Sequence, residues 1–256
     1  MNMAEYQDYQ KVQIFANGYK ISAMYRVRFH ASGPCLKGQW EGPHWRDVAP
    51  LELPYFRAEG SGHRPRTTVK LCYHDAGISG IFKVEDRYVR CIRTEYMDPV
   101  YKDSCVEFFV QPRPGGGYFN FEFNCGGTLL CSYISDPERT ADGFKQFTPL
   151  PLEDGGQVRV YHSLPATVAP EITGPIIWLL EFFIPFALFE KYTGNIGDPA
   201  GQEWAANFFK CGDETSHPHW GSWQPLPSLN FHLPECFGKI RFEEREEGPI
   251  TMNPEL

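Results

Sequence analysis

The sequence is short of three features that would each indicate a class of protein. It has no stretch of about eighteen apolar residues, since its most apolar run, 176–188, contains Glu181 and Pro185, so no membrane-spanning helix is predicted. Its eight cysteines form no C-x-x-C pair, which argues against a zinc ribbon or a dithiol redox motif. Lys and Arg number 24 against 32 Asp and Glu, so we expect no basic surface for nucleic acid or membrane lipid.

Signals for export and for a second domain are absent as well. Residues 1–19 are polar and contain no apolar signal-peptide core, and the sequence has no N-x-[ST] glycosylation site. We therefore expect reduced thiols and a cytoplasmic protein, or a secreted one if a signal peptide preceded this sequence. No linker, repeat or dinucleotide-binding glycine fingerprint is visible, so one domain is expected at 20–243, between an N-terminal segment, 1–19, and a charged tail, 244–256.

The sequence is rich in short strand-like segments and in aromatic residues, which make up 15% of it. Runs of β-branched and aromatic residues, separated by Gly, Pro and Asp, occur at 67–74, 78–86, 104–111, 118–124, 128–134, 158–161, 176–184 and 239–242. Helical character is limited to 185–192 and 3–14, and 137–156 is expected to be a long surface loop. This pattern predicts an all-β fold, an antiparallel β-sandwich of jelly-roll or immunoglobulin-like type with long loops and less than about a sixth of its residues in helices.

The segment 104–124 is the most informative one, because two strand-like runs alternate strictly on either side of a Pro- and Gly-rich turn. Alternation places one apolar set towards the core: Val106, Phe108, Val110, Phe119, Phe121 and Phe123. It places a polar set on the opposite face: Glu107, Asn120, Glu122 and Asn124. A slip of one residue would expose the phenyl rings and bury the polar set. We therefore expect the Phe side chains to be buried and the polar set to share an accessible face.

The polar set has two functional interpretations and a structural one. Carboxylates and carboxamides in fixed positions make the hydrogen bonds that a polyhydroxylated ligand requires. Glu107 and Glu122 could instead be the carboxylate pair of a glycosidase, which would lie roughly 5–10 Å apart. The face could also be merely solvated, although Asn is uncommon in strands and its presence here favours a specific role.

A second cluster of aromatic and polar residues occurs at 204–223, with three of the six Trp and two of the eight His. Its candidate ligand-binding residues are Trp204, Lys210, Asp213, His217, His219 and Trp223. Trp rings stack on pyranose rings, while polar side chains bind their hydroxyls. The alternative is a Trp-rich loop packed over one end of the sandwich. Cys211, Asp213, His217 and His219 could bind a metal, but the segment is rich in turns and we expect no zinc there.

Three motifs resemble the family 9-like carbohydrate-binding modules. They are V-Y-K-D-S-C-V-E-F-F at 100–109, Y-F-N-F-E-F-N-C-G-G at 118–127, and N-F-F-K-C-G-D at 207–213, the last followed by H-P-H, Trp223 and N-F-H-x-P-E-x-F-G at 230–238. The similarity runs in the family's order from Trp40 to Phe242. It implies a β-sandwich that binds sugars without cleaving them. The founding members are modules of plant-cell-wall hydrolases that hold glycan-chain ends between Trp rings and bind structural calcium.

Carried over by motif, the resemblance implies that Glu107, Glu122 and Asn124 belong to a polar sugar site and that Trp204 or Trp223 forms an aromatic wall. It implies calcium as a structural ion and no catalytic residue. We therefore predict non-catalytic binding of a mono- or oligosaccharide, linked to carbohydrate catabolism, without a nucleic-acid or membrane partner. The alternatives are a glycoside hydrolase that uses Glu107 and Glu122, and a cytoplasmic scaffold for protein interaction or metal binding.

Overall fold

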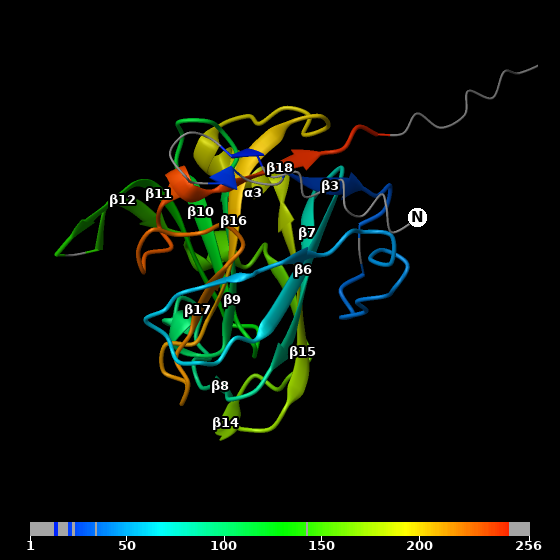
Figure 1. Cartoon of the computed structure of the whole chain (residues 1–256). Helices are drawn as coiled ribbons and strands as arrows, with labels where there is room; N and C mark the ends of the chain where they lie inside the picture. Colours follow the sequence, from blue (N-terminus) through cyan, green and yellow to red (C-terminus); the bar gives the residue numbers. More distant parts are fainter. Residues whose placement is uncertain (1–12, 15–19, 22–23, 34, 142, 246–256) are drawn as a thin grey trace, which may run out of the picture.

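Two large β-sheets face each other and enclose the core between them (Figure 1). The computed structural model describes residues 13–14, 20–21, 24–33, 35–141 and 143–245. Strands make up 45% and helices 8%, so the predicted all-β sandwich with very little helix is confirmed. Among the described residues, no helix is long and apolar enough to span a membrane.

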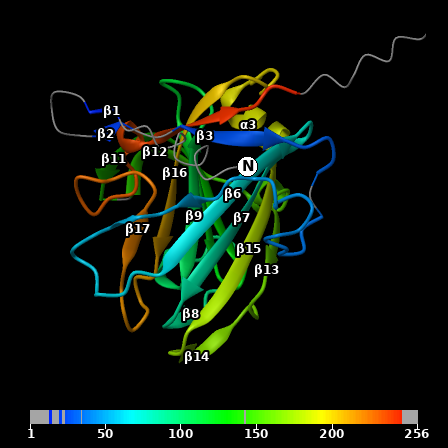
Figure 2. The ribbon, with the colours of Figure 1, turned by 45° about the vertical axis from the view of Figure 1, so that its right-hand side comes forward.

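The first sheet contains the hairpin that was predicted at 104–124. Its strands in spatial order are β12 (Gly143–Pro149), β11 (Leu129–Thr140), β10 (Tyr118–Asn124), β9 (Cys105–Gln111), β16 (Glu203–Cys211) and β18 (Gly238–Phe242), and β16 also pairs with β17 (Trp220–Ser222), which pairs with β5 (Tyr55–Phe56). The second sheet consists of β6 (Arg66–His74), β7 (Gly77–Asp86), β15 (Ile176–Pro185) and β13 (Arg159–His162), with β4 (Leu51–Glu52) beside β6. Figure 2 shows β6, β7, β15 and β13 side by side.

The strand β3 (Tyr25–Phe29) joins the two sheets at one end of the sandwich. It pairs in parallel with β18 on one side and with β6 on the other, so the expectation of antiparallel pairing is wrong at these two places. Parallel neighbours need a long connection, which exists here because β3 comes early in the chain and β18 late. Two small antiparallel pairs complete the strands: β8 (Val89–Cys91) with β14 (Val168–Ile172), and β1 (Gln13–Ile14) with β2 (Lys20–Ile21).

The hairpin of β9 and β10 supplies much of the core, as the alternation predicts. Phe119, Phe121 and Phe123 are each 0% exposed, which confirms the predicted register. The ring of Phe123 stacks on Phe182 of the opposite sheet with centroids 5.4 Å apart. Because the alternating phenyl rings lose their hydrophobic burial if the strand slips, this register is fixed by the sequence itself.

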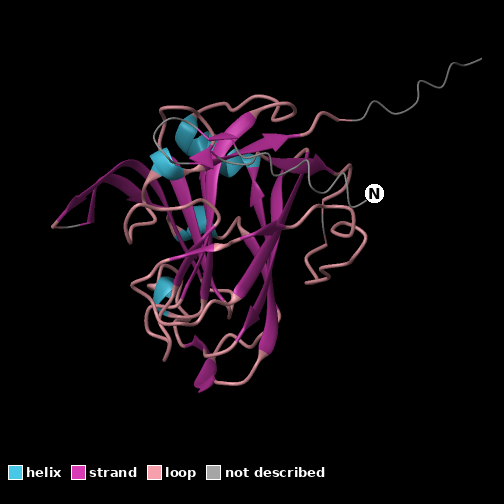
Figure 3. Ribbon diagram, in the orientation of Figure 1, coloured by secondary structure: helices cyan, strands magenta, loops and turns pink. Residues whose placement is uncertain are grey.

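Helices are few and short (Figure 3). The helix α3 (Phe186–Thr193) agrees with the prediction for 185–192 and ends at Gly194, whose φ of 75° suits a glycine. The other helices of the described residues are α2 (Leu152–Gly155), η2 (Val100–Lys102) and η3 (Pro234–Cys236). Of the predicted N-terminal helix, 3–12 lies outside the described residues, and Gln13–Ile14 is a strand. Residues 246–256 of the predicted tail also lie outside them.

The expectation of a long loop at 137–156 is wrong. β11 and β12 continue as a paired ribbon there, and α2 follows. Exposed ion pairs lie along the outer part of the ribbon: Lys145 Nζ lies 2.6 Å from a carboxylate oxygen of Glu138 and 3.4 Å from one of Asp136. A strand without a buried face shows no apolar alternation, so its sequence resembles that of a loop.

Candidate functional site

The predicted polar face exists, but it is covered. Glu107 and Glu122 are direct cross-strand partners on β9 and β10, so they do lie on one face. Their exposed fractions are 2% and 4%, and those of Asn120 and Asn124 are 3% and 0%. The prediction that this face is accessible is therefore wrong. We call this side of the first sheet, turned away from the main core, the outer face.

Segments distant in the sequence fold over the outer face. A small apolar cluster lies over its carboxyl groups and comprises Val100, Cys105 and Cys211, with Leu130, Trp220 and Phe231 packed against them. The ring of Phe231 stacks on Phe209 of β16 with centroids 4.1 Å apart. The alternation of one strand reveals no such cover, since the cover comes from η2 and from the chain after β16.

The two asparagines of the polar set are engaged in holding the backbone. Asn120 accepts a hydrogen bond from the Ser132 amide of the neighbouring strand at 2.7 Å. Asn124 donates to the Arg93 carbonyl at 2.8 Å and accepts from the Thr128 amide at 3.0 Å, which fixes the turn after β10. These bonds explain why Asn occurs in a strand here without a ligand.

The two buried carboxyl groups are satisfied to different degrees. Cys211 Sγ donates to Glu107 Oε1 at 3.0 Å. Glu122 Oε1 accepts from Asn120 at 2.8 Å, whereas Glu122 Oε2 is buried and has no hydrogen-bond partner. Burial raises the pKa of Glu107 well above its ordinary value, and burial raises the pKa of Glu122 to about 7. The outer face therefore holds one carboxyl oxygen that still lacks a partner.

Tyr101, Asp213 and Trp220 stand at the edge of this cover, and we call these three residues the rim. Trp220 Nε1 donates to Asp213 Oδ1 at 2.7 Å, and the Asp213 amide donates to the Tyr101 carbonyl at 3.1 Å. Tyr101 is 37% exposed, and Asp213 and Trp220 are half-buried. Burial raises the pKa of Asp213. The rim thus combines two partly exposed aromatic residues with a carboxylate that Trp220 fixes by a hydrogen bond.

Only Asp213 of the rim was predicted from the sequence. Tyr101 occurs in the first motif and Trp220 in the cluster at 204–223, but no local pattern distinguishes a half-exposed aromatic residue from a buried one. Their partial exposure follows from the tertiary contacts of η2 and β17.

The two tryptophans predicted as an aromatic wall lie in the core instead. Trp204 is 2% exposed and lies 4.7 Å from Phe242, centroid to centroid. Trp223 is 6% exposed and lies 5.8 Å from Phe208. Because Trp204 and Phe208 alternate on one face of β16, Trp204 points between the sheets. The expectation that either ring faces a ligand is wrong.

Lys210 and His219 form a buried ionic network on the core side of β16. Both are 0% exposed, and Lys210 Nζ donates to His219 Nε2 at 2.8 Å. Lys210 Nζ also lies 3.5 Å from Asp86 Oδ2, while His63 Nε2 lies 2.8 Å from Asp86 Oδ1. Burial alone would raise the pKa of Asp86, but the Lys210 charge and the His63 hydrogen bond hold it below its usual range. Lys210 and His219, which were predicted to bind ligand, therefore have their polar partners inside the protein.

The candidate metal set around the H-x-H motif does not converge. Cys211 faces Glu107 on the outer face, whereas His219 lies with Lys210 on the opposite side of β16. The ring of His217 stacks on Tyr88 with centroids 3.6 Å apart. The absence of zinc from this set stays a prediction.

The resemblance implies a structural calcium ion, so the ligand types that the structure brings together can be compared with those that calcium requires. Within the described part of the chain, the metal-type ligands that cluster are Cys105, Glu107 and Cys211. Calcium takes six to eight oxygen ligands, and two thiols do not supply them. This cluster therefore does not fit calcium.

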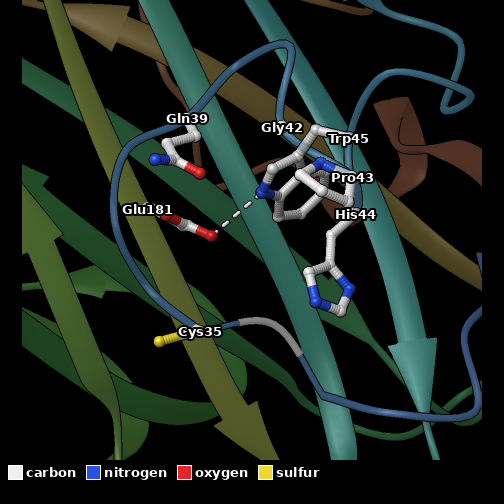
Figure 4. Close-up of a pocket in the computed structure, with 7 residues that line it drawn as sticks. All are labelled: Cys35, Gln39, Gly42, Pro43, His44, Trp45 and Glu181. Carbon is white, nitrogen blue, oxygen red and sulfur yellow. Dashed lines mark hydrogen bonds between the residues drawn. The ribbon is translucent and has the colours of Figure 1, made fainter.

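Two cavities occur away from the outer face. The first, of about 20 Å³, lies under a loop that covers the second sheet, where Trp45 Nε1 donates to Glu181 Oε1 at 2.9 Å (Figure 4). The other Glu181 oxygen accepts from the amides of Lys37 and Gly38, so this carboxylate is fully bonded. The second cavity, of about 390 Å³, is lined by uncharged residues of 94–96, 126–129 and 155–166. None of the residues predicted to bind ligand lines either cavity.

The family assignment follows from comparison of the whole chain. The family model described as carbohydrate-binding family 9 matches residues 48–242, most of the sequence. The chain belongs to carbohydrate-binding family 9. The predicted resemblance is thereby confirmed. An extracellular protein of Arthroderma benhamiae is 26% identical to this family 9 chain over 194 residues, which cover 70% of this chain and 79% of that protein.

Solved structures agree with the assignment to family 9. A Bacteroides uniformis protein that has been proposed to bind carbohydrate is 28% identical, with a TM-score of 0.75 over 86% of this chain and 99% of its own. A family 9 module of Caldicellulosiruptor kristjanssonii, solved with glucose, is 13% identical, with a TM-score of 0.55 over 87% of this chain and 98% of its own. A family 9 module from the same organism, solved with cellotriose, is 14% identical, with a TM-score of 0.56 over 90% of this chain and 100% of its own. At sequence identities this low, the comparison shows only that these modules and this chain have the same fold.

Proposed function

We propose that this family 9 chain binds a mono- or oligosaccharide without cleaving it, and that the sugar lies against the rim of Tyr101, Asp213 and Trp220. The observation that carries the proposal is the rim itself, two partly exposed aromatic residues and a carboxylate that Trp220 fixes by a hydrogen bond, in a chain of this family. Aromatic faces pack on the C–H face of a pyranose, and a carboxylate accepts bonds from its hydroxyls.

The rim is preorganised for such a ligand. The hydrogen bond from Trp220 Nε1 to Asp213 fixes the plane of the indole, and the Asp213 amide is itself bonded to the backbone of Tyr101. A site that is rigid before binding loses little conformational entropy on binding. The ligand covers only one side of the rim, so dissociation constants roughly in the micromolar to millimolar range are expected. A link to carbohydrate catabolism is part of this proposal.

The glycoside hydrolase alternative finds no support in the geometry. Glu107 and Glu122 are buried opposite each other beneath an apolar cover. The two carboxyl groups of a glycosidase flank the scissile bond and so must be open to substrate. The buried pair therefore supports a structural role, with binding assigned to the rim above it.

Replacing Trp220 tests the proposal. Trp220→Ala should weaken sugar binding at least about tenfold, because loss of a stacking ring removes on the order of 1.4 kcal/mol. Isothermal titration with glucose and cello-oligosaccharides measures this, since the Caldicellulosiruptor kristjanssonii module was solved with glucose and with cellotriose. The matched control is Trp40→Ala: Trp40 is also half-buried but lies with Lys70 of the second sheet, 4.5 Å from its Nζ.

Two results would count against the proposal in different ways. If Trp220→Ala binds sugar as tightly as Trp40→Ala does, the rim is not the site. If the unmodified protein binds neither these sugars nor any glycan of a broad array, sugar binding itself is wrong.

A further inference from the structure

Two cysteines and a glutamate meet beneath the rim. Cys105 on β9 and Cys211 on β16 are direct cross-strand partners, and Glu107 follows Cys105 on the same face. One ligand atom from each of these three residues lies within 4.8 Å of the other two, and Cys211 Sγ is 3.0 Å from Glu107 Oε1. All three side chains are buried and belong to adjacent strands. Their positions are therefore set by the backbone of the sheet and not by mobile loops.

The next strand places a further carboxyl group beside Glu107. Glu122 on β10 is the cross-strand partner of Glu107 and is 4% exposed. Its Oε1 accepts from Asn120, and its buried Oε2 has no hydrogen-bond partner in the structure. A buried carboxyl oxygen without a partner costs free energy, and native proteins rarely leave one so. This free oxygen is an independent indication that a ligand belongs at this place.

We propose that Cys105, Glu107 and Cys211 bind a zinc-type divalent ion. Two thiolates and the carboxylate of Glu107 supply the sulfur and oxygen ligands that Zn²⁺ takes, whereas Ca²⁺ and Mg²⁺ require oxygen ligands only. On binding, each thiol loses its proton to solvent as a metal–sulfur bond forms, and no electron is transferred. The set shares only Cys211 with the H-x-H group for which no zinc is expected.

The cover over the outer face decides how the ion enters. Because Val100, Trp220 and Phe231 pack over the cluster, the folded site is closed to solvent. The ion is then taken up while the chain folds, and it ties β9 and β16 together. This proposal is independent of sugar binding, since no rim side chain is a metal ligand.

Metal analysis of the refolded chain tests the proposal. The protein, unfolded in denaturant with chelator and reductant, is refolded with Zn²⁺ or with Ca²⁺, dialysed and analysed. We expect one equivalent of zinc and no calcium, and a melting temperature about 5 °C or more above that of protein refolded with chelator. Refolding with Co²⁺ should produce a thiolate-to-metal charge-transfer band in the near ultraviolet.

Variants locate the ion. Cys105→Ser and Cys211→Ser should each lose the bound zinc and the cobalt band, while Cys72→Ser keeps both. Cys72 is a matched control because it is also 0% exposed, but it lies on β6 with Trp45, Val48 and Ile81. If a serine variant does not fold, the metal content and cobalt spectrum of the unmodified chain decide the question.

Three outcomes would overturn the proposal. They are unmodified protein that refolds in zinc without retaining it, zinc lost equally from Cys72→Ser and Cys105→Ser, and thiol titration of purified protein that finds Cys105 and Cys211 joined as a disulfide.

Discussion

At the scale of single residues, strand alternation predicts which side of the sheet a side chain faces, but not whether that side is accessible to solvent. Phe121 and Glu122 are neighbours on β10 and point to opposite sides, as the sequence predicts, yet both are buried. The phenyl ring gains hydrophobic free energy from burial, whereas the carboxyl group pays a desolvation cost. Burial of Phe121 is therefore a source of stability, and burial of Glu122 requires a separate explanation.

A first stability prediction follows for Phe121. Phe121→Ala should lower the free energy of unfolding by about 3–5 kcal/mol, because the ring is 0% exposed and leaves a cavity. Phe147→Ala is the control, since Phe147 is 39% exposed on β12 and should cost less than about 1 kcal/mol. Denaturant titration of both variants measures the difference. Equal losses would show that Phe121 is not a core residue.

At the scale of elements, β16 holds different chemistry on its two sides. Lys210 points towards the core and lies 3.5 Å from Asp86 at the end of β7, so an ionic contact joins the two sheets. It also donates to His219, which anchors the segment that leads into β17 and Trp220. The position of the rim thus depends on a buried charge on the opposite side of the same strand.

We predict that Lys210→Met lowers the free energy of unfolding by about 3–5 kcal/mol, because it leaves the Asp86 carboxylate buried without the Lys210 charge. The double variant with Asp86→Asn should recover part of this loss. The control is Lys239→Met on β18, since Lys239 pairs with Glu203 at 3.1 Å on the exposed surface and should cost less than about 1 kcal/mol. If Lys210→Met and Lys239→Met are equally stable, the buried network contributes nothing.

At the scale of the whole molecule, folding makes stability depend on pH through His219. Burial, followed by the Lys210 charge, lowers the pKa of His219 to about 3. The unfolded chain, with a histidine pKa of about 6.5, takes up a proton that the folded chain excludes. Stability from this residue is therefore complete above pH 6.5 and is lost as the pH falls towards 3.

His219→Gln removes this titration while keeping an acceptor for Lys210. Between pH 7 and pH 4, unmodified protein should lose about 3 kcal/mol of unfolding free energy relative to the variant. Denaturant titrations of both proteins across this range provide the comparison, which cancels the contributions of the other titrating groups. A difference that does not change with pH would contradict the assignment.

The sandwich, the hairpin register and the family could be predicted from the amino-acid sequence, because alternation and motif order are properties of neighbouring residues. It could place Phe119, Phe121 and Phe123 in the core, since a strand that slips by one residue loses their burial. Which faces are open to solvent depends on the packing of segments far apart in the chain. Trp204 is buried because the opposite sheet packs on it, and the outer face is covered by η2 and by the segment around Phe231, far from β10 in the chain. Burial of this kind depends on how distant segments pack on a strand, and the alternation of residues within that strand does not predict it.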